Sequence, residues 1–71
     1  MAEKQKVVWP QSWEGTIVWE RINPDGGATA LVWSVPEQTW KRFNRWDVLM
    51  YADDATEEQL IAAGLNPLDF K

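Results

Sequence analysis

The turn sequence from Asn23 to Gly27 is the feature that most constrains the fold of this chain. It lies between residues 15–22 and 28–35, which are both rich in β-branched and aromatic side chains. Asn at the first position, Pro at the second and Asp at the third favour a type I turn, and Gly26 can adopt the left-handed conformation of a G1 bulge. The sequence therefore predicts a β-hairpin over about 15–22 and 28–35.

The turn also predicts the register of this hairpin. Pairing Asn23 with Gly27 sets the facing residues, which are Arg21 with Thr29, Trp19 with Leu31, and Ile17 with Trp33. The apolar members of these pairs share one face, because side chains alternate along a strand, and we assign that face to the core. The opposite face carries smaller side chains, including Val18 and Val32. It is covered by an N-terminal strand or helix, or is left open to a partner.

The chain is short for a protein that must bury a core without cross-links. Its 71 residues include six tryptophans but no cysteine and no histidine. A chain of this length buries only about 60% of its unfolded surface and makes a single domain. Because disulfides and the usual zinc ligands are absent, large aromatic side chains or self-association must reinforce the core. We expect no metal and no cofactor.

Tryptophan suits both a small core and a binding surface, because it has a large apolar ring with a polar N–H group. The hairpin register places Trp19 and Trp33 on the core face. The other four flank the hairpin, and the sequence does not assign them to either the core or the surface; they are Trp9, Trp13, Trp40 and Trp46.

A capping-box pattern, Ser34-Val35-Pro36-Glu37, predicts a helix over about 36–46. On a helix, the aromatic side chains of this segment lie on one side and its cations on the other; they are Trp40, Phe43 and Trp46 against Lys41, Arg42 and Arg45. On a strand, Trp40, Arg42 and Trp46 would instead share a face. We prefer the helix, because its period separates the two kinds of side chain better. Residues 46–51 then form a short buried strand, unless the helix is longer and its apolar stripe tilted.

A second helix is predicted over 57–63. Thr56 and Gln59 form a capping box, and Gly64 occupies the position where a left-handed residue ends a helix, with Leu65 folding back on Leu60. Leu68 and Phe70 lie in the tail that follows, and we expect them to dock this tail onto the domain.

The N-terminal region adds one short strand. Residues 1–6 are polar and expected to be frayed, and Lys6–Trp9 begins a strand that Pro10 ends. The whole pattern predicts an α+β domain over residues 1–71. Its small antiparallel sheet is built on the central hairpin, with one or two short helices, at about 36–46 and 57–63, packed on one face.

The composition argues against several classes of function. Without histidine or cysteine there is no imidazole base and no thiol nucleophile, and so short a chain rarely encloses a cleft for paired carboxylates. We therefore expect no enzyme. The N-terminus lacks the apolar stretch of a signal peptide, and no apolar run approaches the roughly 20 residues of a membrane span. A cytoplasmic, soluble protein without a membrane partner is expected.

Our leading hypothesis is a non-enzymatic binding module that docks onto another protein as a regulator or inhibitor. Small acidic accessory proteins of phages and other mobile elements share this composition. The expected contact residues are Trp40, Arg42, Arg45 and Trp46, with Trp9 and Trp13 as alternatives. Alanine at Trp13 or Trp40 is expected to weaken partner binding and to leave the melting temperature nearly unchanged.

Two other hypotheses remain open. Residues 39–46, the basic-aromatic segment, interleave three cations with three aromatic side chains and could bind single-stranded nucleic acid, although the net charge of −4 disfavours wrapping by such a polymer. A homo-oligomer could instead bury the Val18/Val32 face across a symmetric interface. The acidic residues at 53–58 are explained by the start of the second helix; a cation site or a phosphate mimic is the alternative.

Overall fold

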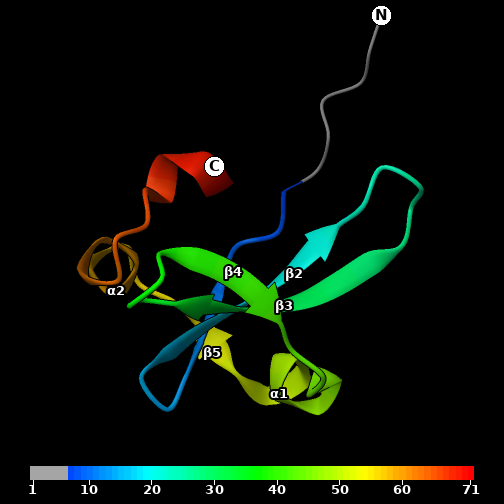
Figure 1. Ribbon diagram of the computed structural model, residues 1–71, viewed down its shortest axis with the longest axis horizontal. Helices are drawn as coiled ribbons and strands as arrows, with labels where there is room; N and C mark the ends of the chain where they lie inside the picture. The colour runs from blue at the N-terminus through cyan, green and yellow to red at the C-terminus, as the bar shows by residue number, and fades with distance from the viewer. Residues whose placement is uncertain (1–6) are drawn as a thin grey trace, which may run out of the picture.

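The structure, a computed structural model that describes residues 7–71, is a five-stranded antiparallel sheet with two short helices and a C-terminal 3-10 helix (Figure 1). The strands are β1 (Gln11–Trp13), β2 (Thr16–Ile22), β3 (Ala28–Ser34), β4 (Thr39–Arg42) and β5 (Asp53–Asp54). Their order across the sheet is β4-β3-β2-β1-β5. The helices are α1 (Trp46–Tyr51), α2 (Glu57–Ala62) and η1 (Pro67–Phe70). The predicted α+β class is confirmed, and the expectation for residues 1–6 lies outside the described residues.

The β2–β3 hairpin has the predicted turn and register. Arg21 pairs with Thr29, and Trp19 pairs with Leu31. The amide of Asn23 donates to the carbonyl oxygen of Gly27 at 2.7 Å, and Gly26 adopts a φ of 92°. The five-residue turn therefore determines the alternation of side chains on both central strands.

The helix predicted over 36–46 is wrong. Residues 35–38 form a turn, and the strand β4 follows it and pairs with β3, with Trp40 opposite Trp33. The hydroxyl of Ser34 does contact the Glu37 carboxylate at 3.3 Å, as a capping box suggests, but this contact lies within a turn that Gln38 ends at a φ of 51°. Pairing with β3 gives the backbone N–H and C=O groups of β4 hydrogen-bond partners and brings the indoles of Trp33 and Trp40 together. The free energy gained from this pairing outweighs the local helical pattern.

The strand predicted over 46–51 is also wrong, because these residues form α1. Val48 is completely buried, whereas Met50 and Tyr51 are exposed. One inward side chain per turn fits a helix lying on the sheet, while a buried strand would need alternate residues inside. The chain then extends through Ala52 into β5, which pairs with β1.

The N-terminal strand begins later than predicted. Val7–Pro10 is not a strand, and β1 starts directly after Pro10, whereas Lys6 lies outside the described residues. Pro10 is fully buried, and its carbonyl oxygen accepts a hydrogen bond from the amide of Ala55 at 3.0 Å. A proline has no amide hydrogen to contribute to a ladder, so the strand begins on its C-terminal side.

The second predicted helix is confirmed. The side chain of Thr56 accepts from the amide of Gln59, and the Gln59 side chain accepts from the amide of Thr56, at 3.1 and 2.8 Å. At the other end, Gly64 has a φ of 91°, and the amide of Leu65 donates to the carbonyl oxygen of Leu60 at 2.8 Å. Both ends therefore follow from local sequence.

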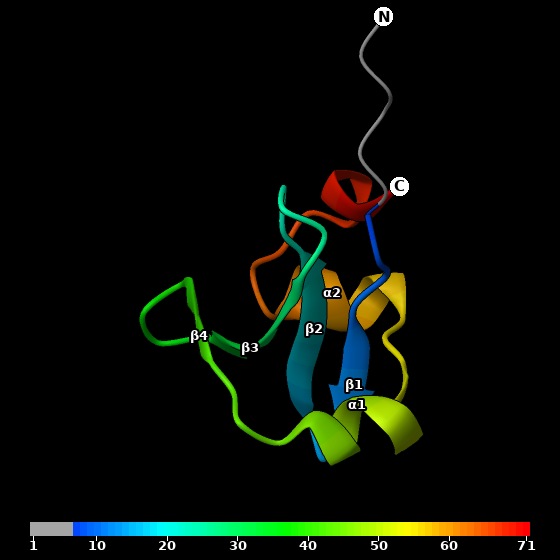
Figure 2. The ribbon, with the colours of Figure 1, turned by 90° about the vertical axis from the view of Figure 1, so that its right-hand side faces the viewer.

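The core lies on both faces of the sheet. The larger cluster packs α2 and η1 against β2; its buried members are Ile17, Ala55, Leu60, Ala63 and Phe70. Val18 points to the opposite face, and α1, which contacts β2, lies on that side of the sheet (Figures 1 and 2). The helices therefore do not share one face. Because Val18 is completely buried within the chain, its face is not open in the way that a symmetric Val18/Val32 interface needs.

Candidate functional site

Three tryptophans from adjacent strands meet on the face of the sheet that carries α2 and η1. Trp33 pairs directly with Trp40 across β3 and β4, and Trp19 lies diagonally from Trp40 on β2. The ring centroids of Trp33 and Trp40 are 5.0 Å apart with planes inclined at 64°, and those of Trp19 and Trp40 are 5.1 Å apart at 39°. Trp40 therefore packs at an angle against the ring on either side of it, and the three rings form a continuous ridged surface.

Phe70 extends this aromatic surface from the C-terminal 3-10 helix. Its ring meets Trp19 edge-on at 5.3 Å and Trp9 edge-on at 6.3 Å. The expectation that the tail docks is confirmed for Phe70, which is buried, whereas Leu68 is 70% exposed.

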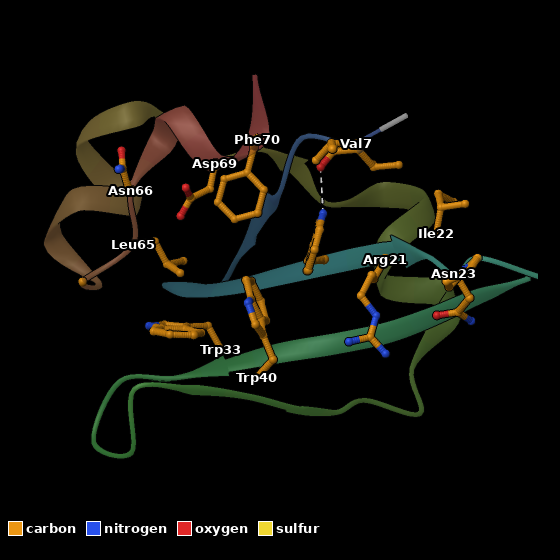
Figure 3. A pocket seen from close by; sticks show the side chains of 14 residues that line it. Val7, Arg21, Ile22, Asn23, Trp33, Trp40, Leu65, Asn66, Asp69 and Phe70 are labelled. Atoms are coloured by element: carbon orange, nitrogen blue, oxygen red, sulfur yellow. Dashed lines mark hydrogen bonds between the residues drawn. The ribbon is translucent and has the colours of Figure 1, made fainter. Parts of the chain in front are cut away.

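A groove of about 710 Å³ runs between this aromatic surface and the C-terminal segment (Figure 3). We call it the aromatic groove; it is lined by Val7, Val8, Trp19, Arg21, Ile22, Asn23, Pro24, Trp33, Trp40, Gly64, Leu65, Asn66, Asp69 and Phe70. Figure 3 shows Trp40 in the middle of the groove, with Trp33 towards one end and Arg21 towards the other. Arg21 and Asp69 are its charged residues and have opposite signs. The groove is therefore apolar with a net charge of zero.

Hydrogen bonds separate the tryptophans into fixed and free indoles. The indole N–H groups of Trp9, Trp19 and Trp33 each donate to a backbone carbonyl at 2.7 Å, and the bond from Trp19 to Val8 is dashed in Figure 3. Within residues 7–71, the indole of Trp40 donates to no protein acceptor, and no buried side-chain polar atom lacks a partner. The Trp40 N–H therefore remains accessible to solvent or a ligand in the aromatic groove.

Of the predicted contact residues, Trp40 and Arg42 lie on the face of the aromatic groove. Trp40 lines the groove, and Arg42 follows it on β4, opposite Leu31. Trp9 is instead a core residue, because its indole is tied to the carbonyl oxygen of Ala55 and its ring packs against Phe70.

The other predicted contact residues gather on the opposite side of the sheet. Trp13 packs against Phe43 at 6.3 Å between ring centroids, and the guanidinium carbon of Arg45 lies 5.7 Å from the centroid of the Trp13 ring. Trp46 is 45% exposed at the start of α1. The six predicted residues therefore do not form one site.

A salt bridge occupies Arg45. Its guanidinium donates to both carboxylate oxygens of Asp47, at 3.1 and 2.9 Å, and to the hydroxyl of Tyr51 at 3.4 Å. The hydrogen bonds from Arg45 lower the pKa of Asp47 to about 2, and they raise the pKa of Arg45. Lys41 similarly pairs with Glu37 and lowers the pKa of that carboxyl group. Two of the three cations of the basic-aromatic segment are therefore already paired.

The acidic residues at 53–58 are spread over different elements. Asp53 and Asp54 form β5, Glu57 opens α2, and the Glu57 carboxylate accepts from Lys71 at 3.2 Å. Between Val7 and Lys71, no group of three or more acidic side chains is arranged to hold a metal ion. Over the same residues, none of the helices has the length and apolar character needed to cross a membrane.

Sequence reasoning missed the groove itself. It assigned Trp19 and Trp33 to the core, and both do pack against the buried cluster, but it did not predict that both also line a groove. It did not consider Arg21 or Asp69 as residues of a binding site. The Trp–Trp pairing on adjacent strands follows only when β4 is recognised, and the alternation of Trp40 and Arg42 was the signal for it.

The chain matches no family model, and comparison with curated proteins and with solved structures gives no match either.

Proposed function

We propose that this protein is a non-enzymatic binding module that docks onto another protein through the aromatic groove. The observation that carries the proposal is the half-buried Trp40, which lies on the groove floor with an indole N–H that no described protein group accepts. Its neighbours Trp19 and Trp33 are fixed by hydrogen bonds, so the surface that they present is preorganised. Tryptophan in a preformed apolar groove is the side chain most enriched in binding hot spots.

The residues that line the groove favour binding over chemistry. Its volume falls within the roughly 300–1,000 Å³ of ligand sites, and its lining is mainly aromatic and aliphatic, with Arg21 and Asp69 as the charged side chains among the described residues. Roles as a regulator or inhibitor, as a cytoplasmic protein, and as a phage or mobile-element accessory protein are part of the same proposal and rest on composition.

Single-stranded nucleic acid is the second candidate partner. Arg21 and Arg42 lie on the face of the sheet that carries Trp19 and Trp40, an arrangement that can combine stacking with phosphate contacts. Two observations weigh against it. The tryptophan rings cover part of one another at centroid distances near 5 Å, and Lys41 and Arg45 are paired with carboxylates. If this candidate is correct, an oligonucleotide will quench the tryptophan fluorescence, with an affinity that falls steeply as salt rises.

Selection from a random peptide library displayed on phage tests the leading proposal. Enriched peptides are measured against the wild type, against the groove variants Trp40→Phe and Arg21→Glu, and against Trp46→Phe on the opposite side of the sheet. We expect both groove variants to weaken binding about five-fold or more, and Trp46→Phe to leave it unchanged. Enriched peptides that bind all three variants equally, or that depend only on Trp46, would contradict the proposal.

A further inference from the structure

We propose that the occupant of the aromatic groove is a proline-rich segment in the polyproline II conformation. This inference rests on the proposed function and specifies its partner. Three properties of the groove support it: the angles between its rings, the free donor on Trp40, and the balance of its charges.

The ring geometry suits a ridged, rigid ligand. Trp40 is inclined to Trp33 by 64° and to Trp19 by 39°, and Phe70 stands edge-on to Trp19. Neighbouring rings along the groove are therefore inclined to one another rather than coplanar. Polyproline II segments dock into aromatic-lined grooves because pyrrolidine rings pack on aromatic faces, and because the segment is already extended before it binds.

The rings are too close together to enclose a methylated ammonium group. Such a cation requires rings that surround an open centre, with the cation within about 6 Å of their centroids. Here Trp40 packs directly against both Trp19 and Trp33, so its ring fills the position between them and leaves no central space for a cation.

The free indole N–H of Trp40 requires an acceptor rather than a donor. A polyproline II backbone has no internal hydrogen bonds, so its carbonyl oxygens are available, and proline residues provide no competing amide donors. In a neighbouring position, Trp19 already donates to the carbonyl oxygen of Val8 at 2.7 Å. An indole on this face therefore already binds a backbone carbonyl oxygen of a segment that lies outside the helices and strands.

The charges of the groove favour an uncharged ligand. Arg21 and Asp69 cancel, and they lie on different elements of the groove wall, β2 and η1. A strongly acidic or basic segment would gain attraction at one residue and repulsion at the other. A run of prolines carries no charge and avoids this conflict.

The test uses a blocked peptide of ten prolines as the probe. Its control is a peptide of the same length in which every second proline is replaced by glycine, which removes the polyproline II preference. Binding is followed by two-dimensional NMR of the indole N–H groups, assigned with single Trp→Phe variants. We expect the decaproline peptide to shift the Trp40 indole signal saturably, the Trp46 signal to stay in place, and the glycine-containing peptide to bind at least five-fold more weakly. Trp40→Phe, which keeps a ring but removes the donor, is expected to weaken decaproline binding about five-fold, and Trp46→Phe to leave it unchanged.

Each contrary outcome has a distinct meaning. Equal affinity for both peptides overturns the polyproline II preference, and so does the absence of any shift at Trp40. If the library selection then yields proline-free peptides that depend on Trp40, the proposed function stands without this partner. If the selection yields no peptide that depends on Trp40, both proposals fail.

Discussion

Trp33 and Ala63, which are thirty positions apart in the chain, are joined by a hydrogen bond of 2.7 Å from the indole N–H to the backbone carbonyl oxygen. The side-chain amide of Gln38 donates to the same oxygen at 3.0 Å. These two bonds tie β3 and the β3–β4 turn to the C-terminal end of α2. They therefore hold the tryptophan floor of the aromatic groove against the segment that forms its wall.

Replacing Trp33 with phenylalanine tests this connection. The substitution keeps an aromatic ring but removes the N–H group, so the carbonyl oxygen of Ala63 keeps only its bond from Gln38. We expect the free energy of unfolding, measured with urea, to fall by about 1–2 kcal/mol. Trp46→Phe is the matched control, because Trp46 is 45% exposed, and its effect should stay within about 0.5 kcal/mol. Equal effects of both substitutions would contradict the role given to Trp33.

Two glycines with nearly the same backbone conformation offer a second test. Gly64 has a φ of 91° and Gly26 a φ of 92°, but a Cβ atom at Gly64 would collide with the side-chain amide of Gln38, whereas one at Gly26 would meet open space. In both alanine variants the free energy of unfolding should fall by about 1 kcal/mol, because alanine disfavours a positive φ. The unfolding free energy of Gly64→Ala should fall further, because the side chain of Gln38 must also move and loses its hydrogen bond to the carbonyl oxygen of Ala63. If thermal unfolding shows equal losses, the contact between Gln38 and the helix end contributes nothing.

The hairpin and the second helix could be predicted because their signals are local. Asn23 to Gly27 specify a turn whose register follows by counting, and Thr56 with Gln59 specifies a helix start through contacts three residues apart. Neither depends on which other segments are nearby. The same reasoning succeeded at Gly64, where a left-handed residue ends the helix.

The segment 34–51 could not be predicted because its structure depends on distant partners. Ser34 and Glu37 make a contact that is compatible with both a helix and a turn. The turn forms because it allows Trp40 to pair with Trp33 on the neighbouring strand. With residues 39–42 in the sheet, Val48 covers a face that the sequence alone leaves open. The groove was missed for the same reason, since Trp40 and Phe70 come to line one groove only in the folded chain.

The structure changes the expectation for Trp40→Ala. Trp40 contacts both Trp19 and Trp33, so its removal exposes two rings and leaves a gap in the groove floor. We now expect a loss of about 1–3 kcal/mol in unfolding free energy, in contrast to an unchanged melting temperature. Trp46→Ala serves as the comparison and should lower the unfolding free energy by less than Trp40→Ala does, because 45% of the Trp46 surface is already exposed. A Trp40→Ala variant as stable as the wild type would mean that the three rings do not support each other.

Neighbouring residues on α2 distinguish core from surface. Leu60 is completely buried in the larger core cluster, whereas Ile61 is 63% exposed. Leu60→Ala is expected to lower the unfolding free energy by about 2–5 kcal/mol, because it leaves a cavity that the small domain cannot close. Ile61→Ala should cost less than about 0.5 kcal/mol. If urea denaturation gives the two variants similar midpoints, the orientation of α2 on the sheet is wrong.

The salt bridge between Arg45 and Asp47 makes stability depend on pH in the acidic range. The hydrogen bonds from Arg45 lower the pKa of Asp47 from 3.8 to about 2 in the folded protein. Because the folded pKa lies below the unfolded value, the pair stabilises the folded state above about pH 4, and this contribution disappears as the pH falls towards 2. Asp47→Asn removes the titrating group. The decline of unfolding free energy between about pH 5 and pH 2 should therefore be shallower in the variant than in the wild type.

The effect should be small and sensitive to salt, since the side chains of Arg45 and Asp47 are 54% and 56% exposed. Urea unfolding across this pH range, repeated with about 1 M sodium chloride, measures both properties. The two profiles should differ at low salt and converge at high salt. Parallel profiles at low salt would show that Arg45 does not hold Asp47 in solution, and Arg45 would then be free to contact a partner from its place over Trp13.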